Sequence, residues 1–159
     1  MEKETKKTKI CFAASTGGHF EQLMMLKPLM EKYDSFIITE KTKYSVNKNE
    51  KIKTYYMKQV NRKEITFPTN MIINLFKSLY IFIKEKPDYM ITTGVLAMIP
   101  MTLITKLFGK KLIYIESFAK ISSPTQTGKL LYKYADRFYV QWEKMKEFYP
   151  NAIYKGGIY

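Results

Sequence analysis

The chain has 159 residues, of which 46% are hydrophobic, so it is long enough to bury a core and too apolar to remain disordered. Its single cysteine, Cys11, excludes an intrachain disulfide or a cysteine-based metal cluster and is typical of a reducing compartment. Basic residues number 27 against 14 acidic ones, and the net charge of +13 favours polyanionic partners such as nucleic acid, anionic lipid or phosphorylated substrates.

The N-terminus carries charges but no apolar core of a signal peptide. The longest uncharged stretch, 89–105, is interrupted by a glycine and a proline, whereas a membrane-spanning helix needs about 20 apolar residues. We therefore expect a chain without a spanning helix. Residues 1–8 are predicted to be a flexible basic tail, and residues 9–159 a single domain.

Short apolar segments that end in polar or glycine residues predict strands at 9–14, 35–39, 52–57, 89–92, 111–116, 137–140 and 152–154. Apolar residues at helical spacing and helix-boundary residues predict helices between them, at 19–30, 68–84, 97–108, 127–135 and 143–149. Pro68 favours a helix start and Gly109 a helix end. This alternation predicts an α/β fold, a Rossmann-like parallel sheet with helices on both faces.

Three of these strands end in residues suited to binding a ligand, and in an open parallel sheet such ends share one edge. The residues are Ser15, Thr16, Gly17 and Gly18 after the first strand, Gly94 after the fourth, and Ser117 after the fifth. Paired glycines before a helix allow close approach of a phosphate, although a plain strand-to-helix turn is the alternative. Neither the dinucleotide fingerprint nor the P-loop pattern occurs, and we predict no cofactor and no metal.

Two titratable residues stand at the same predicted edge. His19, the only histidine, begins the helix after the glycine turn, where a neutral imidazole can accept a proton from a sugar hydroxyl or orient a phosphate. Glu116 follows an apolar strand and is a candidate partner for a sugar hydroxyl or for His19. The alternatives are a structural histidine and a carboxylate that is exposed or paired with a lysine.

The helix predicted at 68–84 has almost no polar face, so it is either buried or lies against something apolar. Eight basic residues and one acidic residue fall between positions 41 and 63. An apolar helix rimmed by basic side chains suits an anionic membrane surface. The candidate membrane contacts are Lys58, Arg62, Lys63, Phe76, Lys77 and Tyr80. A packing helix, a protein contact and a solvated lysine surface are the alternatives.

The small-Thr-Gly-Gly-His turn, the Thr92-Thr93-Gly94 turn and the segment 114–118 together resemble one family, over almost the whole chain. It is the membrane-anchoring subunit of the two-part UDP-N-acetylglucosamine transferase of lipid-linked oligosaccharide synthesis, whose bacterial relatives act in capsule and exopolysaccharide assembly. The first turn is also similar to that of the peptidoglycan lipid-intermediate glucosaminyltransferase.

The resemblance implies the N-terminal, acceptor-side domain of a GT-B glycosyltransferase with an inverting mechanism. It implies that Gly17, Gly18 and His19 face a polyprenyl-diphosphate-linked saccharide, with Glu116 nearby. The expected partner is a C-terminal-type subunit that binds the UDP-sugar. The expected location is peripheral, on the inner face of the cell membrane. A non-catalytic scaffold and a nucleic-acid-binding domain are the alternatives, although no nucleic-acid motif occurs and arginine is scarce.

Overall fold

The computed structural model describes residues 7–41, 51–94 and 96–159. Most of the predicted tail, 1–8, lies outside this range, as do two of the eight basic residues between 41 and 63, Lys43 and Lys48. The described residues form one seven-stranded, entirely parallel sheet in the order β3-β2-β1-β4-β5-β6-β7. Its strands are β1 (Lys9–Ala13), β2 (Asp34–Glu40), β3 (Lys53–Met57), β4 (Tyr89–Thr92), β5 (Lys111–Ile115), β6 (Arg137–Val140) and β7 (Ile153–Tyr154).

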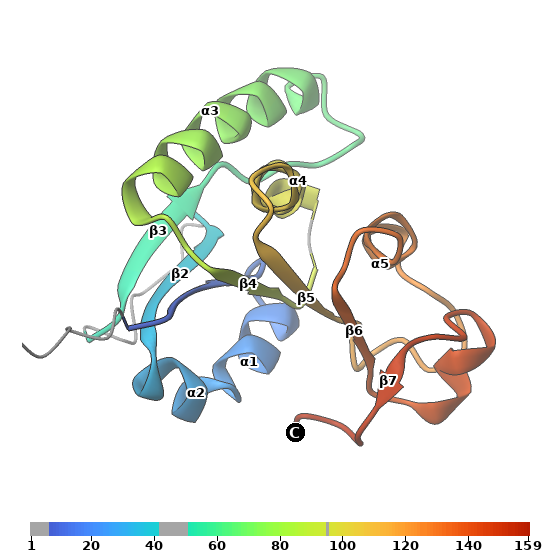
Figure 1. Cartoon of the computed structure of the whole chain (residues 1–159). Coiled ribbons are helices and arrows are strands. Elements are labelled where there is room, and N and C mark those ends of the chain that lie inside the picture. Colours follow the sequence, from blue (N-terminus) through green and yellow to red (C-terminus); the bar gives the residue numbers. More distant parts are fainter. Residues whose placement is uncertain (1–6, 42–50, 95) are drawn as a thin grey trace, which may run out of the picture.

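Helices cover both faces of the sheet (Figure 1). The helices are α1 (Gly18–Met24), α2 (Lys27–Lys32), α3 (Phe67–Glu85), α4 (Ile99–Leu107) and α5 (Gln126–Leu131), with 3-10 helices at Leu96–Met98 and Glu143–Glu147. In Figure 1, α1 and α2 lie below the sheet and α3 and α4 above it. The predicted Rossmann-like α/β fold is confirmed.

Alternation along the strands explains the two-sided core. In β1, Cys11 and Ala13 pack into the cluster under α3 and α4, whereas Ile10 and Phe12 pack into the cluster under α1 and α2. Successive side chains of a strand point to opposite faces, so a strand buried on both sides must be apolar throughout. This is why the strands could be recognised as continuous apolar runs.

The helix predicted at 19–30 is wrong as a single element, because the structure has α1 and α2 with a break at Met25 and Leu26. Pro28 explains the break: it has no N–H to donate, and its ring would clash with the carbonyl of Met24 in a continuous helix. The helices predicted at 97–108 and 127–135 are shorter in the structure, and the one at 143–149 is a 3-10 helix. Within the described residues, no helix is long and apolar enough to cross a membrane.

Candidate functional site

The sheet has its topological switch point between β1 and β4, which pair in parallel although the chain leaves β1 for β2 on one side and reaches β4 through α3 on the other. Open α/β sheets bind ligands in the crevice at such a point, beyond the carboxyl ends of the strands. Thr93 bridges this crevice: its N–H donates to the carbonyl of Ala13 over 3.3 Å, and its Oγ1 donates to the carbonyl of His19 over 3.0 Å. The predicted glycine turn and the Thr-Thr-Gly turn are therefore neighbours.

The glycine turn is open to solvent. Gly17 adopts φ +74°, in the left-handed region that favours glycine, and its carbonyl accepts the N–H groups of Phe20 and Glu21 to start α1. No atom lies within 4 Å of the position that a Cβ would occupy on Gly17 or Gly18. A ligand can thus approach the backbone at both residues. Ser15 and Thr16 are partly exposed beside them.

His19 is half-buried at the first turn of α1, and its Nδ1 is buried without a hydrogen-bond partner among the described residues. Burial lowers the pKa of His19 below its ordinary 6.5, and this outweighs the raising effects of the Thr93 backbone and the Glu116 charge. The imidazole is therefore neutral at neutral pH. A neutral imidazole can accept a proton.

Glu116 is fully buried at the end of β5, and no lysine or arginine pairs with it among the described residues. Its carboxylate accepts hydrogen bonds from hydroxyls and backbone N–H groups instead. The donors are the Tyr149 hydroxyl at 2.9 Å, Thr125 Oγ1 at 2.9 Å, the Ser117 N–H at 2.9 Å, the Thr125 N–H at 3.2 Å and the Tyr114 hydroxyl at 3.4 Å. The alternative of an exposed or lysine-paired carboxylate is wrong, because hydrogen bonds from hydroxyls and backbone N–H groups satisfy this carboxylate.

Gly94 and Ser117 lie against the hydrogen-bond network of Glu116, and not in open space as Gly17 and Gly18 do. Gly94 has φ +90°, and a Cβ there would lie 2.6 Å from the Tyr114 hydroxyl. Gly94 therefore permits the Tyr114 ring to pack beneath the turn. Ser117 is buried, with only 6% of its surface exposed, so its hydroxyl is less accessible than the glycine turn.

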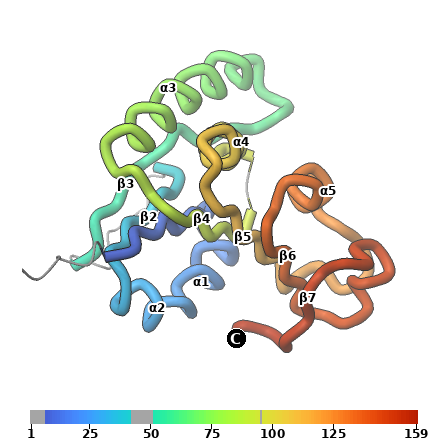
Figure 2. Tube along the Cα trace, in the orientation of Figure 1, coloured from blue at the N-terminus to red at the C-terminus, as the bar shows by residue number. Residues whose placement is uncertain are grey.

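A second buried network, which sequence reasoning missed, joins α1 to the C-terminal residues. Gln141 Nε2 donates to Gln22 Oε1 over 3.1 Å and to the Glu116 carbonyl over 2.9 Å, and its Oε1 accepts from the Ile158 N–H over 3.0 Å. The C-terminal residues return towards α1 (Figure 2), where Ile158 packs against the core cluster. No sequence signal indicates this pairing of Gln22 with Gln141.

Glu40 is a further residue that the sequence analysis did not select. It ends β2 at the same edge and is 4% exposed. Burial raises the pKa of its carboxyl against the lowering effect of the Val60 and Thr16 backbones. Like Glu116, it ends an apolar strand, and that shared position is the signal that could have found it. Among the described residues, no group of three or more His, Cys, Asp or Glu side chains is arranged to hold a metal ion.

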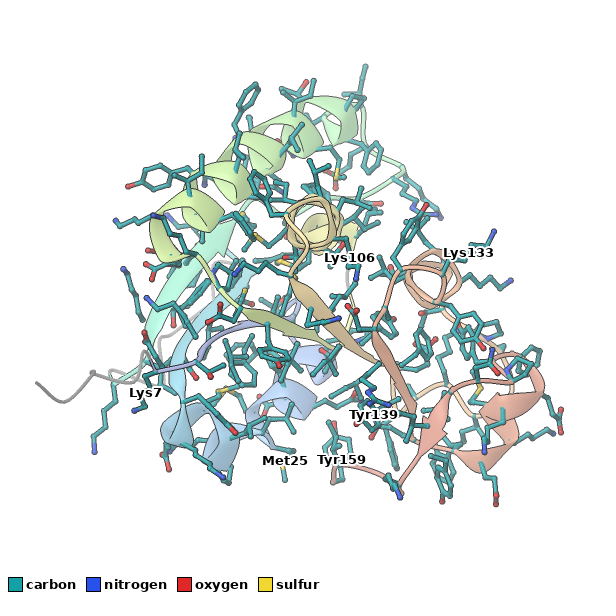
Figure 3. All side chains as sticks on the ribbon, viewed as in Figure 1. Lys7, Met25, Lys106, Lys133, Tyr139 and Tyr159 are labelled. Atoms are coloured by element: carbon teal, nitrogen blue, oxygen red, sulfur yellow. The ribbon has the colours of Figure 1, made fainter. Side chains whose placement is uncertain are left out.

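Helix α3 exposes many apolar side chains and buries three polar ones. Asn74, Ser78 and Glu85 are buried beside the apolar Ile81 and Phe82. Lys77 and Lys84 are exposed, together with six large apolar or aromatic side chains: Ile72, Leu75, Phe76, Leu79, Tyr80 and Ile83. In Figure 3, side chains of α3 project away from the sheet. A fully buried packing helix, one alternative for this segment, is therefore excluded.

An apolar groove of about 500 Å³ runs between α3 and α4. Its lining is Met71, Ile72, Leu75, Ile99, Pro100, Leu103, Ile104 and Leu107. The basic residues predicted as membrane contacts lie near α3: Lys58 directly follows β3, Arg62 and Lys63 are exposed in the segment before α3, and Lys77 is exposed on the helix. They belong to α3 and to the segment before it, whereas His19 belongs to α1, which lies on the other side of the sheet (Figure 1).

Residues 10–158 match the family described as "Oligosaccharide biosynthesis protein Alg14 like". The human UDP-N-acetylglucosamine transferase subunit ALG14 is 27% identical over 177 residues, which cover 94% of this chain and 82% of the human protein. The Yarrowia lipolytica protein of the same name is 27% identical over 173 residues, which cover 93% of this chain and 80% of the relative.

Solved structures with the same fold include MurG from Acinetobacter baumannii, with a TM-score of 0.70 at 17% identity over 86% of this chain and 42% of that chain. UDP-N-acetylglucosamine 2-epimerase from Rickettsia bellii has a TM-score of 0.72 at 12% identity over 96% of this chain and 45% of that chain. This chain thus spans less than half of either solved chain. Identities this low establish the fold alone.

Proposed function

Because the chain belongs to the Alg14-like family of oligosaccharide biosynthesis proteins, we propose that it is the acceptor-side subunit of a split, inverting glycosyltransferase. In this proposal it binds a polyprenyl-diphosphate-linked saccharide, docks on the inner face of an anionic membrane and recruits a C-terminal-type subunit that binds a UDP-sugar. The family match over residues 10–158 carries the proposal. The relatives' name, UDP-N-acetylglucosamine transferase subunit, supports the donor class and the need for a partner.

The product class that the family description supports is an oligosaccharide. The relatives reported above are eukaryotic, and they favour lipid-linked oligosaccharide synthesis over bacterial capsule or exopolysaccharide assembly. Assembly of a capsule or exopolysaccharide stays a prediction of the motif resemblance.

In the proposed reaction, the acceptor diphosphate lies against the open backbone of Gly17 and Gly18, beside the hydroxyls of Ser15 and Thr16. The acceptor hydroxyl attacks the anomeric carbon of the donor sugar. The new C–O bond forms as the bond to UDP breaks, and the hydroxyl proton passes to His19. The lowered pKa of His19 supports this role, because a base must be unprotonated at working pH.

Glu116 acts in this proposal as a positioning residue. Its five hydrogen-bond donors come from β5, the segment after it and Tyr149, so it shapes the wall of the site. Its charge also favours the protonated form of His19, which stabilises the imidazolium that forms when the proton is transferred. Gly94 and Ser117 complete that wall.

Membrane docking is supported by the large apolar side chains that α3 exposes. Phe76 is 67% exposed and Tyr80 is 60% exposed, on a helix whose buried side carries a glutamate and an asparagine. Exposed apolar surface of this extent marks an interaction site, and the basic side chains of Lys58, Arg62 and Lys63 favour an anionic one.

The transfer test uses a panel of UDP-sugars and a lipid-diphosphate saccharide in vesicles, with this chain alone and with a candidate partner subunit. We expect transfer only with both chains, with UDP-N-acetylglucosamine as the donor. We expect His19→Ala to lower kcat by about 100-fold or more, the range of general-base catalysis. The matched control is Gln126→Ala, an exposed residue of α5.

If the His19→Ala variant assembles normally with the partner and transfers sugar at the wild-type rate, His19 is not the base. The chain would then be a scaffold that activates its partner. Transfer by this chain alone would contradict the split enzyme. For docking, we expect Phe76→Ser with Tyr80→Ser to abolish sedimentation with anionic vesicles while transfer in detergent persists. Vesicle binding equal to wild type would remove α3 from the docking surface.

A further inference from the structure

A hollow of about 520 Å³ lies where β3 ends beside α3, and three lysines contribute to its lining. Its residues are Lys41, Tyr56, Met57, Lys58, Gln59, Asn70 and Lys77. We call this the lysine hollow. It is distinct from the glycine turn, which lies at β1.

Helix α3 holds the floor of the lysine hollow in place. Asn70 Nδ2 donates to the Gln59 carbonyl over 3.3 Å, and Lys77 Nζ donates to the Tyr56 carbonyl over 3.3 Å. Between them, the fully buried Asn74 accepts from the Lys58 N–H over 2.9 Å and donates to its carbonyl over 2.8 Å.

Positions 70, 74 and 77 fall on one side of a helix, so a single row of α3 side chains fixes the segment after β3. On the other side of β3, the Lys41 N–H donates to the Met57 carbonyl over 2.9 Å. The backbone positions of Lys41 and Lys58 are therefore fixed by hydrogen bonds, and Lys77 projects from a 19-residue helix.

None of the three lysines forms an ion pair with an acidic residue in the part of the chain that the structure describes. Other lysines differ: Lys106 and Lys111 pair with Asp136, and Lys110 pairs with Asp88. Three lysines around one hollow, without a carboxylate of the described residues paired to them, attract an anion.

The lysine hollow adjoins the exposed apolar side of α3, because Lys77 lies three residues before the exposed Tyr80 on the same helix surface. An anion bound there sits at the edge of an apolar surface. A phospholipid has this chemistry, with a phosphate next to acyl chains. A free phosphate or a nucleic-acid backbone would leave the apolar side uncovered.

We propose that the lysine hollow binds the phosphate of an anionic phospholipid headgroup while the apolar side of α3 contacts the acyl region. This inference rests on the docking part of the proposed function and specifies its ligand. Because Lys41 follows β2 and Lys58 follows β3, this contact brings the carboxyl ends of these two strands towards the bilayer.

The test compares vesicles of phosphatidylcholine alone with vesicles of equal parts phosphatidylcholine and phosphatidylglycerol. The variant carries Lys41→Gln, Lys58→Gln and Lys77→Gln. Since a basic residue near an anionic surface contributes roughly fivefold to binding, we expect the triple variant to bind the anionic vesicles about 100-fold more weakly. We expect the wild-type advantage for anionic vesicles to shrink as salt is added.

The matched control removes the same charge elsewhere, with Lys32→Gln, Lys133→Gln and Lys144→Gln. All three are exposed, and Lys133 lies just after α5, far along the chain from the lysine hollow (Figure 3). We expect this control to lose less than about tenfold in binding, through the long-range field alone. Equal losses in the two triple variants would overturn the proposal in favour of a diffuse charge effect.

Two further arms separate the possible sources of the anion. Glycerol phosphate in solution should shift the amide NMR signals of Lys58 and Gln59 only weakly, because it lacks the apolar contact. Tight binding of glycerol phosphate to the wild type would also overturn the proposal. So would binding of RNA by the wild type that the Lys41, Lys58 and Lys77 variant loses while its vesicle binding stays intact. Transfer by the wild-type pair in detergent reports on the proposed enzyme separately, since no anionic bilayer is present.

Discussion

The hydroxyl of Tyr149 donates a hydrogen bond to Oε2 of Glu116 over 2.9 Å, although the two residues are 33 positions apart and both are buried. Burial and the adjacent carboxylate raise the pKa of Tyr149, so the phenol remains a donor throughout the physiological range. The bond ties the end of β5 to the segment before β7.

Replacing Tyr149 with phenylalanine removes this donor while keeping the ring. We expect Tyr149→Phe to lower the free energy of unfolding by about 2 kcal/mol, because a hydrogen bond to a charged group is lost inside the protein. Urea denaturation measures the change. Tyr134→Phe, at a residue 45% exposed, is the control and should change stability little. Equal effects of the two variants would show that the Glu116 network tolerates the loss of one donor.

Gly94→Ala should destabilise the fold more than Gly109→Ala. Both glycines have positive φ, +90° and +68°, and each alanine costs about 1–2 kcal/mol for that backbone conformation. Only at Gly94 does the new Cβ also meet the Tyr114 hydroxyl, at 2.6 Å. We expect an extra loss of about 1–3 kcal/mol there in thermal denaturation. If the two variants melt alike, the Tyr114 ring moves aside freely.

The stability of the protein should fall in acid, in part because of Glu85. Burial opposes ionisation of its carboxyl, but hydrogen bonds from Lys53, Tyr55 and Lys9 outweigh burial and hold its pKa at about 2, below the ordinary 4.5. A carboxyl whose pKa is lower in the folded state stabilises the fold above pH 4.5 and loses this effect as the pH falls towards 2.

Glu85→Gln should therefore lower the free energy of unfolding at neutral pH by about 2 kcal/mol and flatten its decline in acid. Denaturation curves at several pH values measure both effects. Glu31→Gln, at an exposed residue of α2, is the control and should keep the wild-type slope. An unchanged slope in Glu85→Gln would assign the acid sensitivity to other carboxyls such as Asp136.

His19 should contribute a second pH dependence with its own range. Its pKa is lowered by burial, so the unfolded chain binds a proton near pH 6.5 that the folded chain does not. Stability is then complete above pH 6.5 and falls below it. We expect His19→Asn to remove this component from unfolding curves between pH ~7.5 and ~5.

The transfer rate of the assembled pair should, for the same reason, persist to more acidic pH than an ordinary histidine would allow. A rate that falls with a midpoint at or above 6.5 would contradict a buried, neutral base.

Much of the fold could be predicted from the sequence, because strands buried on both faces must be apolar over their whole length. The segments Tyr89–Thr92 and Arg137–Val140 were predicted with the bounds that the structure has. The glycine turn and His19 were recognisable because their order after an apolar strand is local. The roles of these site residues stay predictions.

Contacts between distant residues could not be predicted in this way. Gln141 meets Gln22 across 119 positions, and Glu116 meets Tyr149 across 33. A single sequence carries no signal for such pairs, because hydrogen-bond geometry depends on how the strands are ordered in the sheet. The alternative of an exposed or lysine-paired Glu116 failed for this reason, since the donors to its carboxylate include hydroxyls from three separate segments.

Helix α3 shows which features the sequence determines and which depend on the tertiary structure. Its sequence by itself determined that a long helix forms, from Pro68 at its start to the residues before Pro87, and that most of its surface is apolar. Only the tertiary structure decided which side is buried. Asn74 forms hydrogen bonds with the backbone of Lys58, and Glu85 accepts hydrogen bonds from Lys9, Lys53 and Tyr55. These polar residues are therefore buried beside Ile81 and Phe82, and the other large apolar side chains of the helix remain exposed.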